Sequence, residues 1–97
     1  MRKGINVEMR TGLFKRARFK LKVTAEGLTF VPGAKSGDKI SIHATRIREV
    51  TFYEARLQME IQADTLTDAY FANSDDLYVT MNALKENLSV KIVCEYN

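Results

Sequence analysis

The chain has 97 residues, of which 45% are hydrophobic and 28% are charged, with one proline and five glycines. This length supports one domain rather than two, and the composition excludes a disordered or low-complexity chain. One cysteine and one histidine exclude an intramolecular disulfide and a Cys/His zinc site within a single chain.

We expect no export signal and no transmembrane segment. The first residues include charged side chains, but the apolar stretch of a secretory signal peptide does not follow them. No stretch approaches the roughly 18 uncharged apolar residues that span a bilayer. These features predict a cytoplasmic location, with peripheral contact at a membrane as an option.

Positive and negative charges are unevenly distributed along the chain, whose net charge is +3. Residues 1–50 contain twelve Lys or Arg and four Asp or Glu, whereas residues 51–97 contain three and eight. Such an asymmetry can mark an anion-binding surface. It also disappears if the two halves interleave in one compact domain, so both interpretations stay open.

Alternating apolar and polar side chains predict strands, because neighbouring side chains on a strand point to opposite faces. Residues 5–10 alternate in this way, and residues 16–23 do so most clearly. The second segment sets Ala17, Phe19, Leu21 and Val23 against Arg16, Arg18, Lys20 and Lys22. One face must be core, and the other must meet solvent or a partner. Further strands are predicted at residues 28–31, 40–42, 47–52, 57–63 and 69–72, with a turn over residues 64–67.

The period then changes to that of a helix. An apolar stripe with spacings of four, three and four is formed by Leu77, Met81, Leu84 and Leu88. Asn73 or Ser74 is the expected N-cap, and the helix is expected to end near residues 87–89. Residues 90–96 are predicted to form a strand-like tail within a single domain that spans residues 1–97.

Several segments together carry a resemblance to a known family. They are Lys39-Ile40-Ser41-Ile42, Ile47-Arg48-Glu49-Val50, Leu57-Gln58-Met59-Glu60-Ile61, Ala69-Tyr70-Phe71, the helical leucine and methionine stripe, and the hairpin of residues 20–30. With these segments the chain resembles a pleckstrin-homology-like domain, particularly the GRAM and bacterial PH-like branch. The resemblance implies a mainly β fold, an antiparallel β-barrel or sandwich of about seven strands with one C-terminal amphipathic helix.

The candidate binding site is a set of basic residues around the second predicted strand. Four of them, at every second position from Arg16 to Lys22, share one strand face. Their mutual repulsion has a cost, which predicts acidic cross-strand neighbours or an anionic partner. The family resemblance implies phosphoinositide contact through basic residues of the first two strands, here Arg10, Lys15, Arg16 and Arg18. The alternative is an edge strand that charge protects from aggregation.

Other candidates are interpreted as structural. Nucleic acid is disfavoured, because Phe19 alternates with the basic residues and therefore points away from them, into the core. His43 is expected to be a structural histidine and Cys94 a small apolar residue. Leu13 and Phe14 are expected in the core, with membrane insertion as the alternative. We predict no catalytic residue, no cofactor and no metal site.

We therefore expect a non-catalytic module, not an enzyme, that binds an anionic lipid or a phosphoinositide-type membrane surface. The expected site comprises Arg10, Lys15, Arg16, Arg18, Lys20 and Lys22. The alternative is a protein-interaction or homo-oligomerisation domain that uses its sheet edges, including residues 90–96. For that tail, the simplest interpretation is a strand that closes the domain's own sheet.

Overall fold

The computed structural model describes residues 4–10, 15–33 and 37–97. These residues form eight strands, one short 3-10 helix and one α-helix. In chain order the elements are β1 (Ile5–Arg10), β2 (Arg16–Thr24), β3 (Gly27–Pro32), β4 (Ile40–His43), η1 (Ala44–Arg46), β5 (Glu49–Tyr53), β6 (Gln58–Gln62), β7 (Leu66–Phe71), α1 (Ser74–Asn87) and β8 (Lys91–Glu95). The fold is thus mainly β with one helix after the seventh strand, as predicted.

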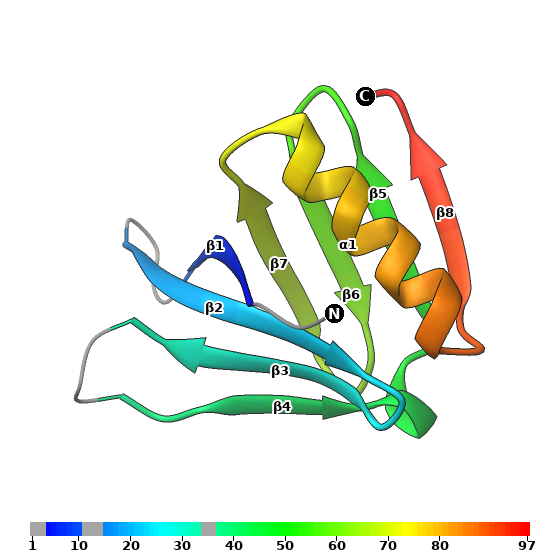
Figure 1. Cartoon of the computed structure of the whole chain (residues 1–97), viewed down its shortest axis with the longest axis horizontal. Coiled ribbons are helices and arrows are strands. Elements are labelled where there is room, and N and C mark those ends of the chain that lie inside the picture. The colour runs from blue at the N-terminus through cyan, green and yellow to red at the C-terminus, as the bar shows by residue number, and fades with distance from the viewer. Residues whose placement is uncertain (1–3, 11–14, 34–36) are drawn as a thin grey trace.

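The strands form a single open sheet in the order β4-β3-β2-β1-β7-β6-β5-β8. All neighbouring strands are antiparallel except β5 and β8, which are parallel. The pairing of β1 with β7 joins two halves, β1–β4 and β5–β8. Figure 1 shows these halves running in clearly different directions, with α1 lying across the sheet.

The inner face of the sheet and one side of α1 form the core. The predicted alternation is realised on β1 and β2, where the apolar residues are buried, except half-buried Ala17, and the intervening polar residues are exposed. Phe52 and Phe71 stack with their ring centroids 6.5 Å apart. From the helix, Leu77, Met81 and Leu84 are buried against the sheet, and Leu88 is buried just beyond the helix end.

Helix α1 begins where its sequence predicts. The side-chain oxygen of Asn73 accepts a hydrogen bond from the backbone N–H of Asp76 at 2.9 Å, which satisfies a donor that the first turn leaves free. Asp75 and Asp76 lie in the first turn, where the helix dipole favours negative charge. The helix ends at Asn87, within the predicted range.

Three features differ from the sequence-based expectations. Strand β2 lies between β3 and β1, so the interpretation of its charges as protection for an edge strand is wrong. Strand β7 begins at Leu66, within the segment that was expected to be a turn. On β6, the alternation expected over residues 57–63 is broken at Gln58, which is buried.

The tail is an ordered part of the same sheet. Strand β8 runs parallel to β5, from the pair Glu49–Lys91 to the pair Tyr53–Glu95. This pairing brings the tail into the domain's own sheet and adds an eighth strand to the expected seven. In the described residues, no helix is long and apolar enough to cross a membrane.

Candidate anion-binding groove

A concave pocket of about 990 Å³ lies beside the outer face of β1 and β2, the face opposite the core. We call it the groove and define it by its lining residues, Asn6, Val7, Glu8, Arg16, Arg18, Phe19, Lys20, Gly33, Arg56, Leu57, Gln58, Tyr70, Phe71 and Ala72. Four of these residues are basic, and Glu8 is acidic. The described lining therefore carries an excess of positive charge.

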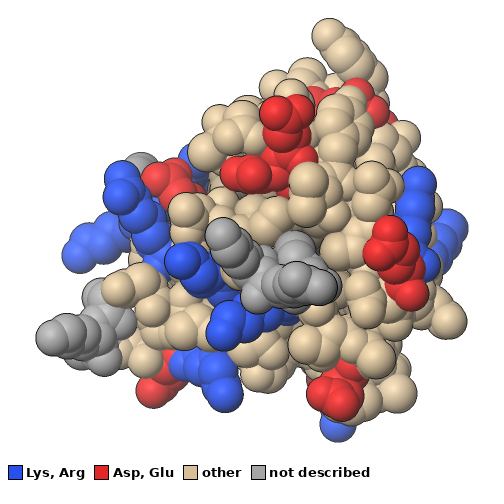
Figure 2. Space-filling view, in the orientation of Figure 1, with Lys and Arg blue, Asp and Glu red and all other residues tan. Residues whose placement is uncertain are grey.

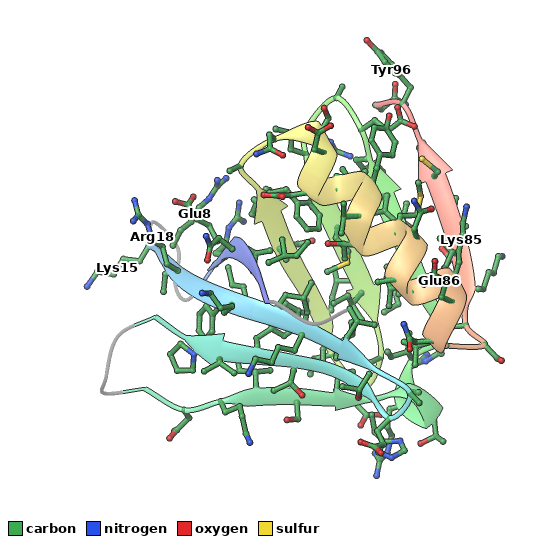
Figure 3. All side chains as sticks on the ribbon, viewed as in Figure 1. Glu8, Lys15, Arg18, Lys85, Glu86 and Tyr96 are labelled. Atoms are coloured by element: carbon green, nitrogen blue, oxygen red, sulfur yellow. The ribbon has the colours of Figure 1, made fainter. Side chains whose placement is uncertain are left out.

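Strand β2 supplies three of the four cations. Because Phe19 and Leu21 point into the core, the alternating residues Arg16, Arg18 and Lys20 must point outward. The register with β1 sets Arg18 opposite Glu8 and Lys20 opposite Asn6. Figure 3 shows Glu8 and Arg18 close together near one end of β2. The regular pleat of a central strand thus holds three basic side chains along one wall.

Arg16 is oriented by two neighbours. Its Nη1 lies 3.7 Å from Oε1 of Glu8, and its guanidinium carbon lies 3.9 Å from the centroid of the Tyr70 ring. Both charged side chains are about half exposed, so this ion pair adds little to stability. Its main effect is positional, because the ring and the carboxylate together limit where the guanidinium can point.

Arg18 and Lys20 are differently placed. Within the segments that the structure describes, neither side chain has an ion-pair partner within 4 Å. Glu8 is an acidic cross-strand neighbour of the kind that the sequence predicts. It is a single carboxylate, however, beside a row of three β2 cations. An anion bound in the groove would relieve the remaining repulsion.

The fourth cation, Arg56, comes from the turn between β5 and β6. This turn contains Leu57 with a φ of 52°, in the left-handed region that non-glycine residues seldom adopt. The carbonyl of Leu57 accepts a hydrogen bond from the Phe71 amide at 2.7 Å, which fixes the turn to the end of β7. The Arg56 guanidinium stacks on Tyr53 at 4.1 Å, and its Nε donates to the Asn97 carbonyl at 3.0 Å. The tail therefore helps to position a groove residue.

The structure separates the six predicted site residues. Arg16, Arg18 and Lys20 line the groove, whereas Lys22 lies farther along the same face of β2 and Lys15 precedes the strand. Figure 3 shows Lys15 projecting away from the molecule. Arg10 lines a second, smaller hollow together with Ile40, Leu66 and Asp68. Leu13 and Phe14 lie outside the described residues.

Sequence reasoning missed Arg56. It stands alone between two predicted strands, and no spacing relates it to the basic run of residues 15–22. The pairing of β1 with β7, together with the anchored β5–β6 turn, brings it to the groove.

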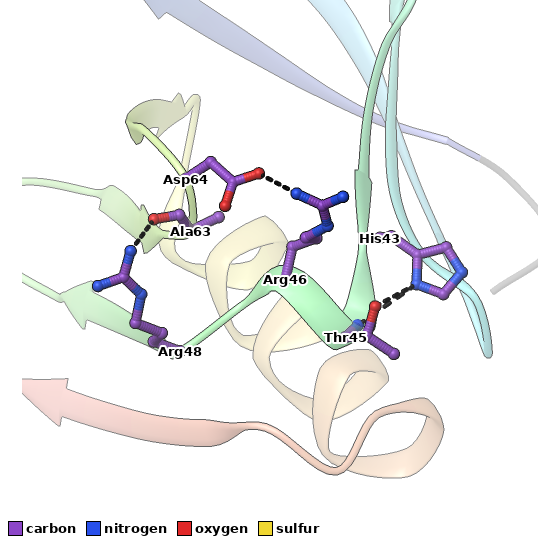
Figure 4. Close-up of polar contacts among 6 residues, drawn as sticks. All are labelled: His43, Thr45, Arg46, Arg48, Ala63 and Asp64. Carbon is purple, nitrogen blue, oxygen red and sulfur yellow. Dashed lines mark hydrogen bonds and ion pairs between the residues drawn. The ribbon is translucent and has the colours of Figure 1, made fainter.

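Other basic residues of the N-terminal half have local structural roles. Figure 4 shows Arg46 paired with Asp64, with 2.7 Å between Nη1 and Oδ2, and Arg48 donating to the Ala63 carbonyl at 2.9 Å. His43 accepts the Thr45 amide through Nδ1 and caps η1, which agrees with its interpretation as a structural residue. The charge asymmetry of the sequence is thus partly cancelled by pairing across the fold.

A positive region nevertheless persists. Figure 2 shows Lys and Arg side chains gathered on the side of the molecule where β2 lies, whereas Asp and Glu predominate near the start of α1. The charge separation expected from the two halves of the sequence therefore survives in part on the surface.

A second polar cluster joins β8 and α1 to the end of β5. Glu54 accepts hydrogen bonds from the Tyr78 hydroxyl at 2.8 Å and from the Cys94 thiol at 2.9 Å. The thiol contact, followed by the hydroxyl contact, holds the pKa of Glu54 below its usual value. The same carboxylate, followed by partial burial, raises the pKa of both Tyr78 and Cys94. This cluster ties the tail to the helix.

The chain has been compared with known proteins by sequence. No protein-family model matches it, and the comparison with curated proteins finds no match.

Proposed function

We propose that this protein is a binding module for the anionic headgroup of a membrane lipid, which the groove receives. The observation that carries the proposal is the meeting of three cations of β2 with Arg56 of the β5–β6 turn around one pocket. These residues come from two different elements, β2 and the β5–β6 turn, and line the same pocket. Arginine suits this task, because its planar guanidinium can donate two parallel hydrogen bonds to a phosphate.

The size and setting of the groove support this proposal. Its volume of about 990 Å³ falls at the upper end of the range of pockets that hold small ligands. The Tyr70 ring, on which the Arg16 guanidinium stacks, accompanies the charges. Because β2 is an interior strand, its row of cations does not serve to protect a sheet edge. Binding a polyanion gives these charges a role.

We also propose that the fold is of the pleckstrin-homology-like type, extended by β8. Two features support this. Seven strands precede one helix that packs on the sheet, and two antiparallel meanders, β1–β4 and β5–β7, are joined by the β1–β7 pair. In this proposal the protein acts without catalysis, on the cytoplasmic side of a membrane.

The test is co-sedimentation with phosphatidylcholine vesicles that contain increasing phosphatidylserine or a small fraction of a phosphoinositide. Binding should persist near 150 mM salt, where charges more than about 8 Å apart are largely screened. The double variant Arg18→Ala/Lys20→Ala should bind roughly tenfold or more weakly, since each basic residue near a lipid surface contributes on the order of 1 kcal/mol. Lys22→Ala is the matched control, because Lys22 lies on the same strand face but outside the groove.

The outcomes distinguish binding in the groove from a general response to the net charge of the protein. A loss confined to groove variants, together with competition by a soluble inositol phosphate, supports headgroup binding. Competition by inorganic phosphate at the same concentration would instead indicate a general phosphate site. Equal losses for the Arg18→Ala/Lys20→Ala variant and the Lys22→Ala control, or binding at low salt alone, would overturn the proposal.

A further inference from the structure

The outer edge of strand β8 takes no part in the groove. Strand β8 stands at one end of the sheet order, with β5 on one side, and no described residue pairs with its other side. Figure 1 shows β8 at the margin of the molecule. A sheet edge of this kind presents unpaired backbone N–H and C=O groups to a neighbouring chain.

The backbone contacts define which groups face outward. The carbonyl of Glu95 accepts a hydrogen bond from the Glu54 amide at 2.8 Å, so the backbone groups of Glu95 point toward β5. Consecutive residues of a strand direct their backbone groups to opposite sides. Those of Ile92 and Cys94 therefore point away from β5, and they can pair with another strand without disturbing the β5 ladder.

The sequence of β8 is complementary to itself in one antiparallel register. With Val93 facing Val93 of a second copy, Lys91 lies opposite Glu95 of that copy, and Ile92 lies opposite Cys94 of that copy. The two outward-facing residues, Ile92 and Cys94, then form hydrogen-bonded pairs on either side of the two-fold axis. Opposite charges that face each other across strands are stabilising.

The side chains next to β8 also fit this register. In the described residues, Glu95 makes no ion pair within 4 Å, whereas Lys91 pairs with Glu49 at 3.2 Å on the same sheet. Lys91 would thus lie between Glu49 of its own chain and Glu95 of the second copy. Tyr96 lies beyond β8, and its carbonyl accepts a hydrogen bond from the Ala55 amide at 2.7 Å, so the proposed pairing is confined to residues 91–95. No proline interrupts residues 90–97.

We propose that two copies of this chain associate through the outer edges of β8, antiparallel about Val93, to form one continuous sheet. The opposite end of the sheet, β4, has four residues and lacks a pair of opposite charges. Pairing of β8 with β4 of another copy would be a head-to-tail contact, which produces rings or open-ended chains of copies and not a two-fold dimer. The two-fold β8 pair predicts a dimer and no larger species. The proposal is independent of the groove, because it uses other residues.

A charge exchange tests the register. Lys91→Glu and Glu95→Lys should each place like charges opposite one another in both cross-strand pairs, and each should weaken dimerisation by at least about fivefold. An equimolar mixture of the two variants should recover the dimer, because every pair in the mixed dimer joins opposite charges. Sedimentation velocity over a concentration series measures all three samples. Circular dichroism verifies the fold of each variant, because Lys91→Glu also brings a second carboxylate near Glu49.

A cross-link provides a second readout that does not depend on charge. Val93→Cys in a Cys94→Ser background should form an intermolecular disulfide on mild oxidation, because directly opposite residues without mutual hydrogen bonds lie about 4.5 Å apart between Cα atoms. Serine at position 94 keeps a donor for Glu54. The matched control is Val79→Cys in the same background, because Val79 is exposed on α1.

The expected result is a concentration-dependent dimer, recovery in the mixed sample, and cross-linking at position 93 well above that at position 79. A protein that stays monomeric at hundred-micromolar concentrations would overturn the proposal. A mixture of variants that recovers no dimer, or equal cross-linking at positions 79 and 93, would do the same. Rings or open-ended assemblies in place of a dimer would also overturn the proposal, in favour of a head-to-tail contact.

Discussion

The carboxylate of Glu54 accepts a hydrogen bond from the thiol of Cys94, with 2.9 Å between Oε1 and Sγ. The two residues are 40 positions apart in the chain, and the parallel pairing of β5 with β8 brings them together. The Tyr78 hydroxyl of α1 donates to the other oxygen of the same carboxylate. One side chain therefore connects β5, the helix and the tail.

The thiol of Cys94 should react slowly at mildly alkaline pH. If the Cys94 thiol ionises, it loses the hydrogen bond that it donates to Glu54 and places a second negative charge beside that carboxylate. The pKa of Cys94 is therefore raised, and the thiolate forms only at higher pH. Glu54→Gln removes the negative charge and should lower that pKa. Alkylation by iodoacetamide near pH 8.5 should then be several-fold faster, and Cys94, as the single cysteine, is the sole reporter.

Two controls define the outcome for this thiol. Glu86→Gln removes a carboxylate from the exposed end of α1 and should leave the alkylation rate unchanged. Denatured wild-type and Glu54→Gln proteins should react at equal rates, because the raised pKa belongs to the folded state. Equal rates for the two folded proteins would show that the Glu54–Cys94 contact does not persist in solution.

Arg56 should matter for anion binding although it lies far along the chain from the basic strand. Arg56→Ala should weaken vesicle binding by about fivefold, which corresponds to the loss of on the order of 1 kcal/mol for one basic residue at a lipid surface. Arg46→Ala is the matched control, because Arg46 is an exposed arginine of η1 that pairs with Asp64 outside the groove. Similar losses for both variants would indicate a response to net charge and not to the groove.

Packing of α1 on the sheet should dominate the stability of the domain. Leu84 is fully buried, so Leu84→Ala should lower the free energy of unfolding by about 2–5 kcal/mol through lost burial and the cavity that remains. Val79→Ala, at a helix position with 49% exposure, should change it by less than about 0.5 kcal/mol. Urea unfolding monitored by circular dichroism measures both. A small effect at Leu84 would contradict the helix position described.

The sequence predicts most of the local structure because the signals for it lie within a few residues. Alternation along residues 16–23 requires a strand with one buried face, and the structure buries Phe19, Leu21 and Val23. The helical spacing from Leu77 to Leu88 and the cap at Asn73 depend only on the helical period and on the free donors of a first turn.

The groove could be predicted in part. Arg16, Arg18 and Lys20 were expected on one face because strand geometry alone places them there. Lys15, Lys22 and Arg10 have the same charge and adjacent sequence positions, yet they lie outside the groove. The strands and turns that lie opposite a basic segment in the fold decide which of its residues line the same pocket.

The sequence by itself therefore determined the strands, the helix and the basic face, since each follows from periodicity within one segment. Only the tertiary structure decided that β2 is interior, that β8 pairs in parallel with β5, and that Arg56 joins the groove. Such pairings depend on which apolar faces can be buried together over the whole chain. The free energy of packing over the whole chain decides which strands pair, so the pairing cannot be predicted from a short segment of sequence.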